Sequence, residues 1–131
     1  MVASIAATVT GVGAPVAQAD HVTCFLQAIG PSKEPGPSNA PIRFGYQVDC
    51  TGRPDGRSIE TVLYRIDGNG NKTRQAFARD QSTDPQKTEL YLSECDPNGE
   101  VSEFYTFAAM LGKHVNLDYT EDTSDPVLLQ C

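Results

Sequence analysis

The sequence predicts an all-β fold, in which seven or eight short strands form an antiparallel two-sheet sandwich. From residue 20 onward, no window keeps apolar residues at helical spacing over three turns. Gly, Pro, Asn and Asp instead interrupt the chain roughly every 8 to 12 residues, which is the turn spacing of β-sandwiches. Four cysteines in so short a chain indicate a disulfide framework that would stabilise such a sandwich.

Turn residues bound each expected strand. The run 67–71 is a strong turn signal, because Gly and Asn tolerate the positive backbone angles of tight hairpins. The longest apolar run, 101–111, predicts a central strand, and residues 112–113 predict the turn after it. The expected strands are 22–29, 42–49, 59–66, 73–79, 89–94, 101–111, 115–119 and 127–130.

The spacing of the cysteines indicates two disulfides that follow hairpins. The cysteines are Cys24, Cys50, Cys95 and Cys131. A hairpin centred on Pro37 places the first two opposite each other, because both lie equally far from the centre. A hairpin centred on Lys113 brings the last two together in the same way. We therefore favour the pairs Cys24–Cys50 and Cys95–Cys131, while a pattern that joins the two sheets remains open.

The first nineteen residues differ in composition from the rest of the chain. Residues 1–19 carry no charge and end in Ala17-Gln18-Ala19, small residues that fit a secretory cleavage site. We therefore expect a signal peptide at 1–19 and one secreted domain at 20–131. A buried N-terminal strand is the alternative for the same stretch. No later segment is long and apolar enough to span a membrane, so we expect an extracellular location.

The charge of the chain limits its partners. The net charge is −7 at pH 7, and the ten basic residues are scattered along the sequence. Nucleic acids and anionic membrane surfaces are therefore poor partners, because both need clustered cations. The acidic excess favours basic partners or cations, and keeps a single domain soluble as the monomer that we expect.

Three short segments carry a resemblance to known domains. Residues 88–92, the turn at 97–99 and residues 105–109 resemble the penultimate strands of fibronectin type III and immunoglobulin-like domains. The resemblance covers residues 88–111, and there Tyr105 would take the place of the tyrosine that forms a corner. It implies an immunoglobulin-like sandwich that serves binding or adhesion and has no catalytic residue.

No constellation of residues predicts catalysis or a resident metal. His21 and His114 are expected to be solvated, and no serine lies in a nucleophile-elbow pattern. The run 67–71 begins like a calcium loop but lacks the glycine and glutamate that such a loop needs, so we expect a hairpin turn. We expect no catalytic residue and no cofactor. Weak calcium candidates, in a run that would have to curl, are Asp118, Glu121, Asp122 and Asp125.

The proline-rich segment 31–41 is the candidate binding feature. Its four prolines restrict the unbound conformations, and a Cys24–Cys50 bridge would clamp the strands that present it. The tip consists of Pro35, Gly36 and Pro37. We expect a secreted, non-catalytic protein that recognises an extracellular protein through this tip, as an inhibitor of a secreted hydrolase would. The alternatives are a plain surface insertion, a small carboxylate- or metal-dependent extracellular hydrolase, and a structural component of a cell surface.

Overall fold

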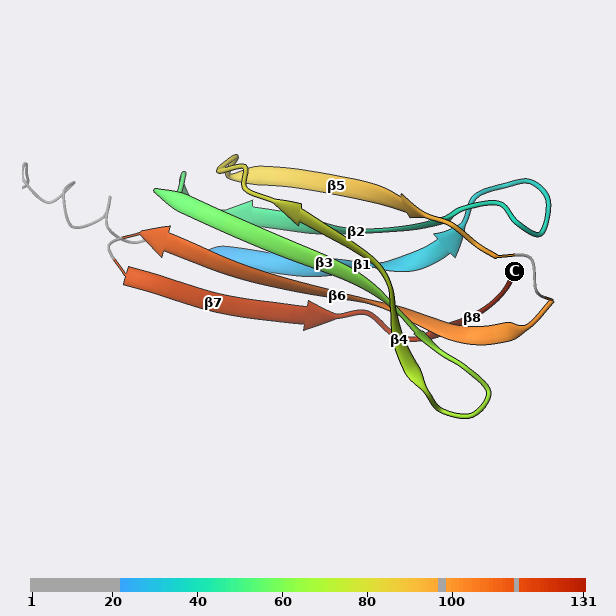
Figure 1. Ribbon diagram of the computed structural model, residues 1–131. Coiled ribbons are helices and arrows are strands. Elements are labelled where there is room, and N and C mark those ends of the chain that lie inside the picture. Colours follow the sequence, from blue (N-terminus) through green and yellow to red (C-terminus); the bar gives the residue numbers. More distant parts are fainter. Residues whose placement is uncertain (1–21, 97–98, 115) are drawn as a thin grey trace, which may run out of the picture.

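The computed structural model describes residues 22–96, 99–114 and 116–131, in which all regular structure is β. Eight strands form two antiparallel sheets that pack face to face (Figure 1). This confirms the predicted sandwich and its strand number. None of the described residues forms a helix that could cross a membrane. The strands are β1 (Cys24–Lys33), β2 (Ile42–Cys50), β3 (Gly56–Ile66), β4 (Lys72–Asp80), β5 (Gln86–Ser93), β6 (Val101–His114), β7 (Asn116–Thr123) and β8 (Val127–Gln130).

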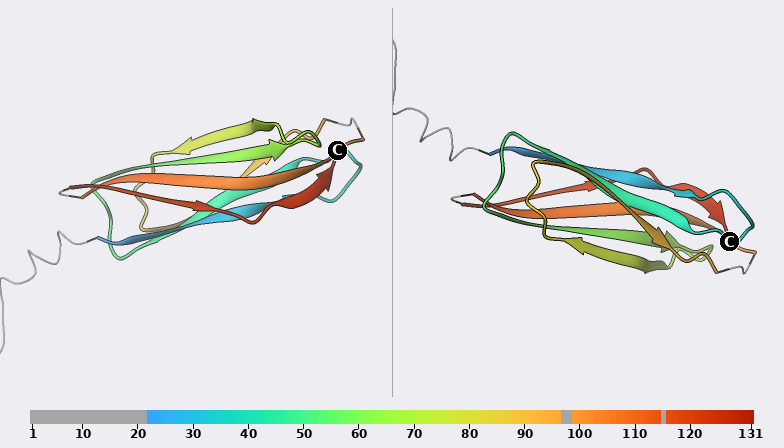
Figure 2. Two further views of the ribbon diagram at one scale, coloured as in Figure 1. Left: turned by 90° about the horizontal axis from the view of Figure 1, so that it is seen from below. Right: turned by 90° about the horizontal axis from the view of Figure 1, so that it is seen from above.

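The two sheets differ in size. One sheet has the order β1-β2-β5, and the other has the order β4-β3-β6-β7, with β8 paired to the first part of β6. The views from above and below show the two layers running nearly along each other (Figure 2). β6 pairs with three other strands, which confirms the central position predicted for the longest apolar run. The predicted signal peptide, residues 1–19, lies outside the described residues.

The first hairpin has the register that the cysteines predict. Cys24 lies opposite Cys50 in the β1–β2 pair, and the two form a disulfide. The second disulfide joins Cys95 and Cys131, so both predicted pairs are confirmed. Cys95 follows β5 of the smaller sheet and Cys131 follows β8 of the larger one, so this second bridge joins the two sheets.

The predicted turn at Gly112 and Lys113 is wrong. Both residues belong to β6, where they pair with Arg57 and Gly56 of β3. The hairpin reverses between His114 and Asn116, which pair with each other. Because β6 pairs with β3 along this stretch, the strand continues through Gly112, which the local sequence predicts to be a turn residue. The strand expected at 115–119 also ends later than predicted, since β7 continues to residue 123.

Alternating inward side chains form two core clusters between the sheets. One cluster lies around Tyr46, Val48 and Ile59, and it includes Cys50. The other lies around Phe44 and Leu63, and it includes Cys95 and Cys131. Each disulfide therefore belongs to one of the two apolar clusters. Burial of these side chains contributes most of the folding free energy, at about 25 cal/mol per Å² of apolar surface.

A polar contact joins the sheets at one edge of the sandwich. The fully buried Tyr46 of β2 donates its hydroxyl hydrogen to Asp80 Oδ2 at the end of β4. Lys87 Nζ lies 2.7 Å from the same carboxylate oxygen, and the amide of Ser82 donates to Oδ1. Burial opposes ionisation of Asp80, but these donors outweigh it and lower the pKa of Asp80 to about 2. Burial and the Asp80 carboxylate together raise the pKa of Tyr46, so its hydroxyl stays protonated.

Replacing Gly45 with alanine should strongly destabilise the fold. A Cβ at this position of β2 would lie 2.0 Å from the backbone oxygen of Glu89 on β5, so the two paired strands would have to separate. We expect the free energy of unfolding in urea to fall by about 2 kcal/mol or more. Gly68→Ala is the control, because a Cβ there meets no atom within 4 Å. Equal stability of the two variants would contradict the β2–β5 contact.

The Asp80 contact should make stability depend on acid pH. Because the folded pKa is lowered, Asp80 stabilises the protein above about pH 4, and this contribution is lost as the pH falls toward 2. In urea unfolding we expect Asp80→Asn to be about 2 kcal/mol less stable than the native protein at pH 7, and this gap to narrow by about 2 kcal/mol at pH 2. Asp84→Asn, at an exposed carboxylate, should show almost no gap at either pH. A gap for Asp80→Asn that does not change with pH would contradict the assignment.

Candidate functional site

The candidate loop is shorter than the sequence suggests, because β1 continues through Lys33. The register shifts between Ile29 and Ser32, which leaves Gly30 and Pro31 as a bulge in the strand. Proline is tolerated there because β1 is the edge strand of its sheet. The connection to β2 therefore spans residues 34–41, and we call it the proline loop.

Backbone hydrogen bonds close the proline loop on itself. The amide of Glu34 donates to the carbonyl of Pro41 at 2.9 Å, and the amide of Ala40 donates to the carbonyl of Pro37 at 2.9 Å. Gly36 has a φ of 141°, which L side chains rarely adopt, so a glycine suits the tip. The predicted tip, residues 35–37, is exposed, whereas Ala40 is only 5% exposed.

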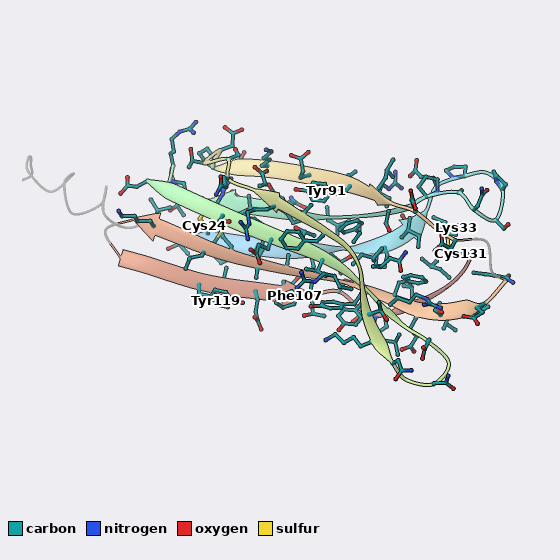
Figure 3. The ribbon with its side chains drawn as sticks, viewed as in Figure 1. Cys24, Lys33, Tyr91, Phe107, Tyr119 and Cys131 are labelled. Carbon is teal, nitrogen blue, oxygen red and sulfur yellow. A yellow bond between two sulfur atoms is a disulfide. The ribbon has the colours of Figure 1, made fainter. Side chains whose placement is uncertain are left out.

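Side chains brace the proline loop from β1 and β2. Lys33 Nζ donates to the carbonyl of Ser38 within the loop and to the carbonyl of Gln130 at 3.0 Å. Gln130 precedes Cys131, and Figure 3 shows Lys33 and Cys131 beside each other at this end of the sandwich. Arg43 of β2 pairs with Glu34 at 3.2 Å. The loop is therefore fixed at its base and in its middle, while the side chains of its tip remain exposed.

A hollow of about 370 Å³ opens beside the proline loop. Its apolar wall includes Leu92 of β5, which is 62% exposed. Glu94 and Asp96 are exposed at the same hollow and give it a negative charge. The residues lining it are Asn39, Pro41, Leu92, Ser93, Glu94, Cys95 and Asp96. An apolar side chain that ends in a positive charge would fit this hollow.

The sequence did not identify these supporting residues. The prolines point to a constrained loop, but no pattern connects Lys33 to Gln130, which lies 97 positions away along the chain. The hollow likewise depends on the end of β5 lying beside the loop, which is a consequence of the β2–β5 pairing. Only the exposed, isolated tip could be located from composition alone.

Residues 67–71, which begin like a calcium loop, form a hairpin turn, as predicted. Asp67 Oδ1 accepts hydrogen bonds from the amides of Asn69 and Asn71, both at 2.9 Å. These bonds oppose a small burial effect and lower the pKa of Asp67. Gly70 takes a φ of 83°, which completes the turn. The carboxylate is thus used to hold the β3–β4 connection.

The acidic run at the end of the chain does not curl. Residues 116–123 form the extended strand β7, so Glu121 and Asp122 point to opposite faces. Asp122 accepts a hydrogen bond from the amide of Ala28 at 2.7 Å, and Glu121 accepts one from Tyr119. Within the described residues, no group of three or more metal-ligating side chains comes together. His21 lies outside the described residues, and His114 ends β6.

Comparisons with known proteins identify no family for this chain. No family model matches the chain, and no curated protein matches it. A Bordetella pertussis protein solved under the name ApaA is 16% identical, with a TM-score of 0.40, over 83% of this chain and 92% of its own. A second structural-genomics target is 12% identical, with a TM-score of 0.35, over 86% of this chain and 89% of its own. Both TM-scores are below 0.5, so neither structure supports an argument, and the resemblance to immunoglobulin-like and fibronectin type III domains stays a prediction.

Proposed function

We propose that this protein is a secreted, non-catalytic recognition module that binds an extracellular protein through the proline loop. The single observation that carries the proposal is the bracing of this loop by Lys33, with the tip left exposed. The two disulfides are consistent with an oxidising compartment, as export would require. An inhibitor of a secreted hydrolase is the form of this function that we favour.

The physics of binding supports this role for the loop. A flexible loop loses conformational freedom when it binds, at about 0.5–1.5 kcal/mol for each immobilised side chain. The proline loop has already lost most of that freedom, because prolines, backbone bonds and Lys33 hold it in one conformation. A partner can therefore contact the tip without first ordering it, and more of the interaction free energy appears as affinity.

The hollow beside the loop indicates which side chain the partner inserts. Leu92 offers apolar surface, while Glu94 and Asp96 supply negative charge at the rim. A lysine or arginine of the partner would place its methylene stem against Leu92 and its charge near the two carboxylates. We therefore propose a partner with a basic residue in its contact surface.

The test is comparative affinity capture from the extracellular fraction of the source, with retained proteins identified by mass spectrometry. The native chain should retain a protein at near-equal stoichiometry. Replacement of Pro35-Gly36-Pro37 by Ser-Gly-Ser, which keeps the glycine at its φ of 141°, should abolish that retention and leave thermal stability nearly unchanged, because the tip makes few contacts. The matched control is Gly68→Ser/Asn69→Ser in the exposed β3–β4 connection, which should retain the same protein. Unchanged retention by the tip variant would refute the loop assignment.

A second prediction concerns the brace itself. Lys33→Met removes both hydrogen bonds of the ammonium group, so the proline loop should open more often. At about 1 kcal/mol lost, hydrogen exchange of the Ala40 amide should become about fivefold faster by NMR. Lys113→Met, near the opposite end of the sandwich, should leave that exchange rate unchanged. Equal Ala40 protection in the native protein and Lys33→Met would show that Lys33 does not hold the loop.

A further inference from the structure

The outer face of the larger sheet carries a cluster of aromatic side chains. Tyr64 of β3 lies opposite Tyr105 of β6, and Val62 lies between Phe77 of β4 and Phe107 of β6. Val62 is only 3% exposed although it belongs to neither core cluster, because the rings on both sides cover it. We call Tyr64, Phe77, Tyr105 and Phe107 the outer patch.

The rings of the outer patch form a packed surface with a hollow beside it. Tyr64 and Tyr105 stack with their centroids 5.2 Å apart, and Tyr64 meets Phe107 edge-on at 6.5 Å. Phe77 remains 44% exposed. An open hollow of about 500 Å³ lies against Tyr64, Tyr105 and Phe107 and is closed on the other side by the segment after β7. Tyr64, Tyr105 and Phe107 are half-buried, and a contiguous, partly exposed aromatic surface of this kind is typical of protein-binding sites.

Two exposed cations of β4 lie on the same face. Lys72 Nζ is 4.3 Å from the ring centre of Tyr64, and the Arg74 guanidinium is 5.2 Å from that of Phe77. Among the described residues, neither cation has a carboxylate within ion-pair distance. The cations that do form such pairs are Arg43, Arg53, Arg65, Arg79 and Lys87. Although the chain has a net charge of −7, two cations without a carboxylate partner lie beside the rings of the outer patch, and they complement an anionic group there.

The spacing of these cations fits an extended chain. Lys72 and Arg74 are two residues apart on one strand, so their side chains leave the same face about 7 Å apart. Carboxylates at alternate positions of an extended peptide have the same spacing. A residue two positions beyond them lies on the same face of the peptide and would place an apolar side chain in the hollow next to Phe107.

We propose that the outer patch, with Lys72 and Arg74, is a second docking surface that binds an extended acidic peptide segment of another protein. Its carboxylates pair with Lys72 and Arg74, and an apolar side chain lies against the tyrosines and Phe107. This surface is on the larger sheet and shares no residue with the proline loop. The inference therefore stands or falls separately from the proposed function.

The probe is a fluorescein-labelled peptide, Glu-Ser-Glu-Ser-Leu-Ser-Glu-Ser-Glu, whose glutamates and leucine share one face when it is extended. It is titrated with the full-length oxidised chain and followed by fluorescence anisotropy. The matched probe has lysine in place of every glutamate. We expect the acidic peptide to bind and the basic peptide to bind at least tenfold more weakly. Raising the salt concentration from 50 to 500 mM should lower the affinity for the acidic peptide at least fivefold. Failure of the acidic peptide to bind, or equal binding of the two peptides, would overturn the proposal.

Two pairs of variants locate the site. The double variant Lys72→Glu/Arg74→Glu should lower the affinity for the acidic peptide at least tenfold. Arg53→Glu/Lys113→Glu changes the net charge equally but lies near the other end of β3, so its effect should stay below twofold. Phe77→Ser should weaken binding about fivefold, whereas Leu111→Ser, at a similar exposure of 47%, should not. Equal losses within either pair would overturn the assignment.

The remaining arms separate this surface from other occupants and from the proline loop. The Ser-Gly-Ser variant of residues 35–37 should bind the acidic peptide as the native chain does. Tighter binding of a labelled oligothymidylate or oligogalacturonate than of the peptide, lost in Lys72→Glu/Arg74→Glu, would overturn the peptide as occupant and assign the surface to an anionic polymer of that class.

Discussion

The Cys95–Cys131 disulfide ties together the end of the sandwich on which the proline loop depends. It links the residue after β5 in one sheet to the residue after β8 in the other, and it closes a loop of 36 positions. By the chain-entropy model, a closure of this length stabilises the folded state by about 3–4 kcal/mol. Its structural consequence is local. It ties the end of β8, which pairs with β6, to the end of β5, and there the Gln130 carbonyl lies where Lys33 can reach it.

The other end of the sandwich combines a disulfide with a buried cation. Arg57 of β3 is only 5% exposed, and its Nη1 lies 3.6 Å from the Cys50 sulfur. Burial lowers the pKa of Arg57, and its Nε and Nη2 have no hydrogen-bond partner among the described residues. A buried guanidinium with unsatisfied donors destabilises a fold by a few kcal/mol. The Cys24–Cys50 bridge and the surrounding apolar cluster therefore have to offset this cost in folding free energy.

The expectations from the sequence agree with the structure where a local pattern determines the feature. They differ where pairing between distant strands determines it. The β1–β2 register follows from the equal distances of Cys24 and Cys50 from Pro37, so it could be predicted from spacing. The β6–β7 turn could not, because Gly112 looks like a turn residue until its pairing with Arg57 is known. The exposed tip of the proline loop was predictable from composition. The hydrogen bonds of Lys33 that hold the loop were not predictable, because Lys33 and Gln130 come together only when both sheets have formed.

The two proposed surfaces differ in charge although they belong to one small acidic domain. Glu94 and Asp96 border the hollow by the proline loop, whereas Lys72 and Arg74 border the outer patch. Complementary charge mainly steers encounter and excludes wrong partners, so the surfaces would select segments of opposite sign. A partner that carries a basic contact residue and an acidic extended segment could engage both. Two weak contacts joined in this way would give a higher overall affinity than either contact alone, because the second contact forms at the effective concentration set by the first.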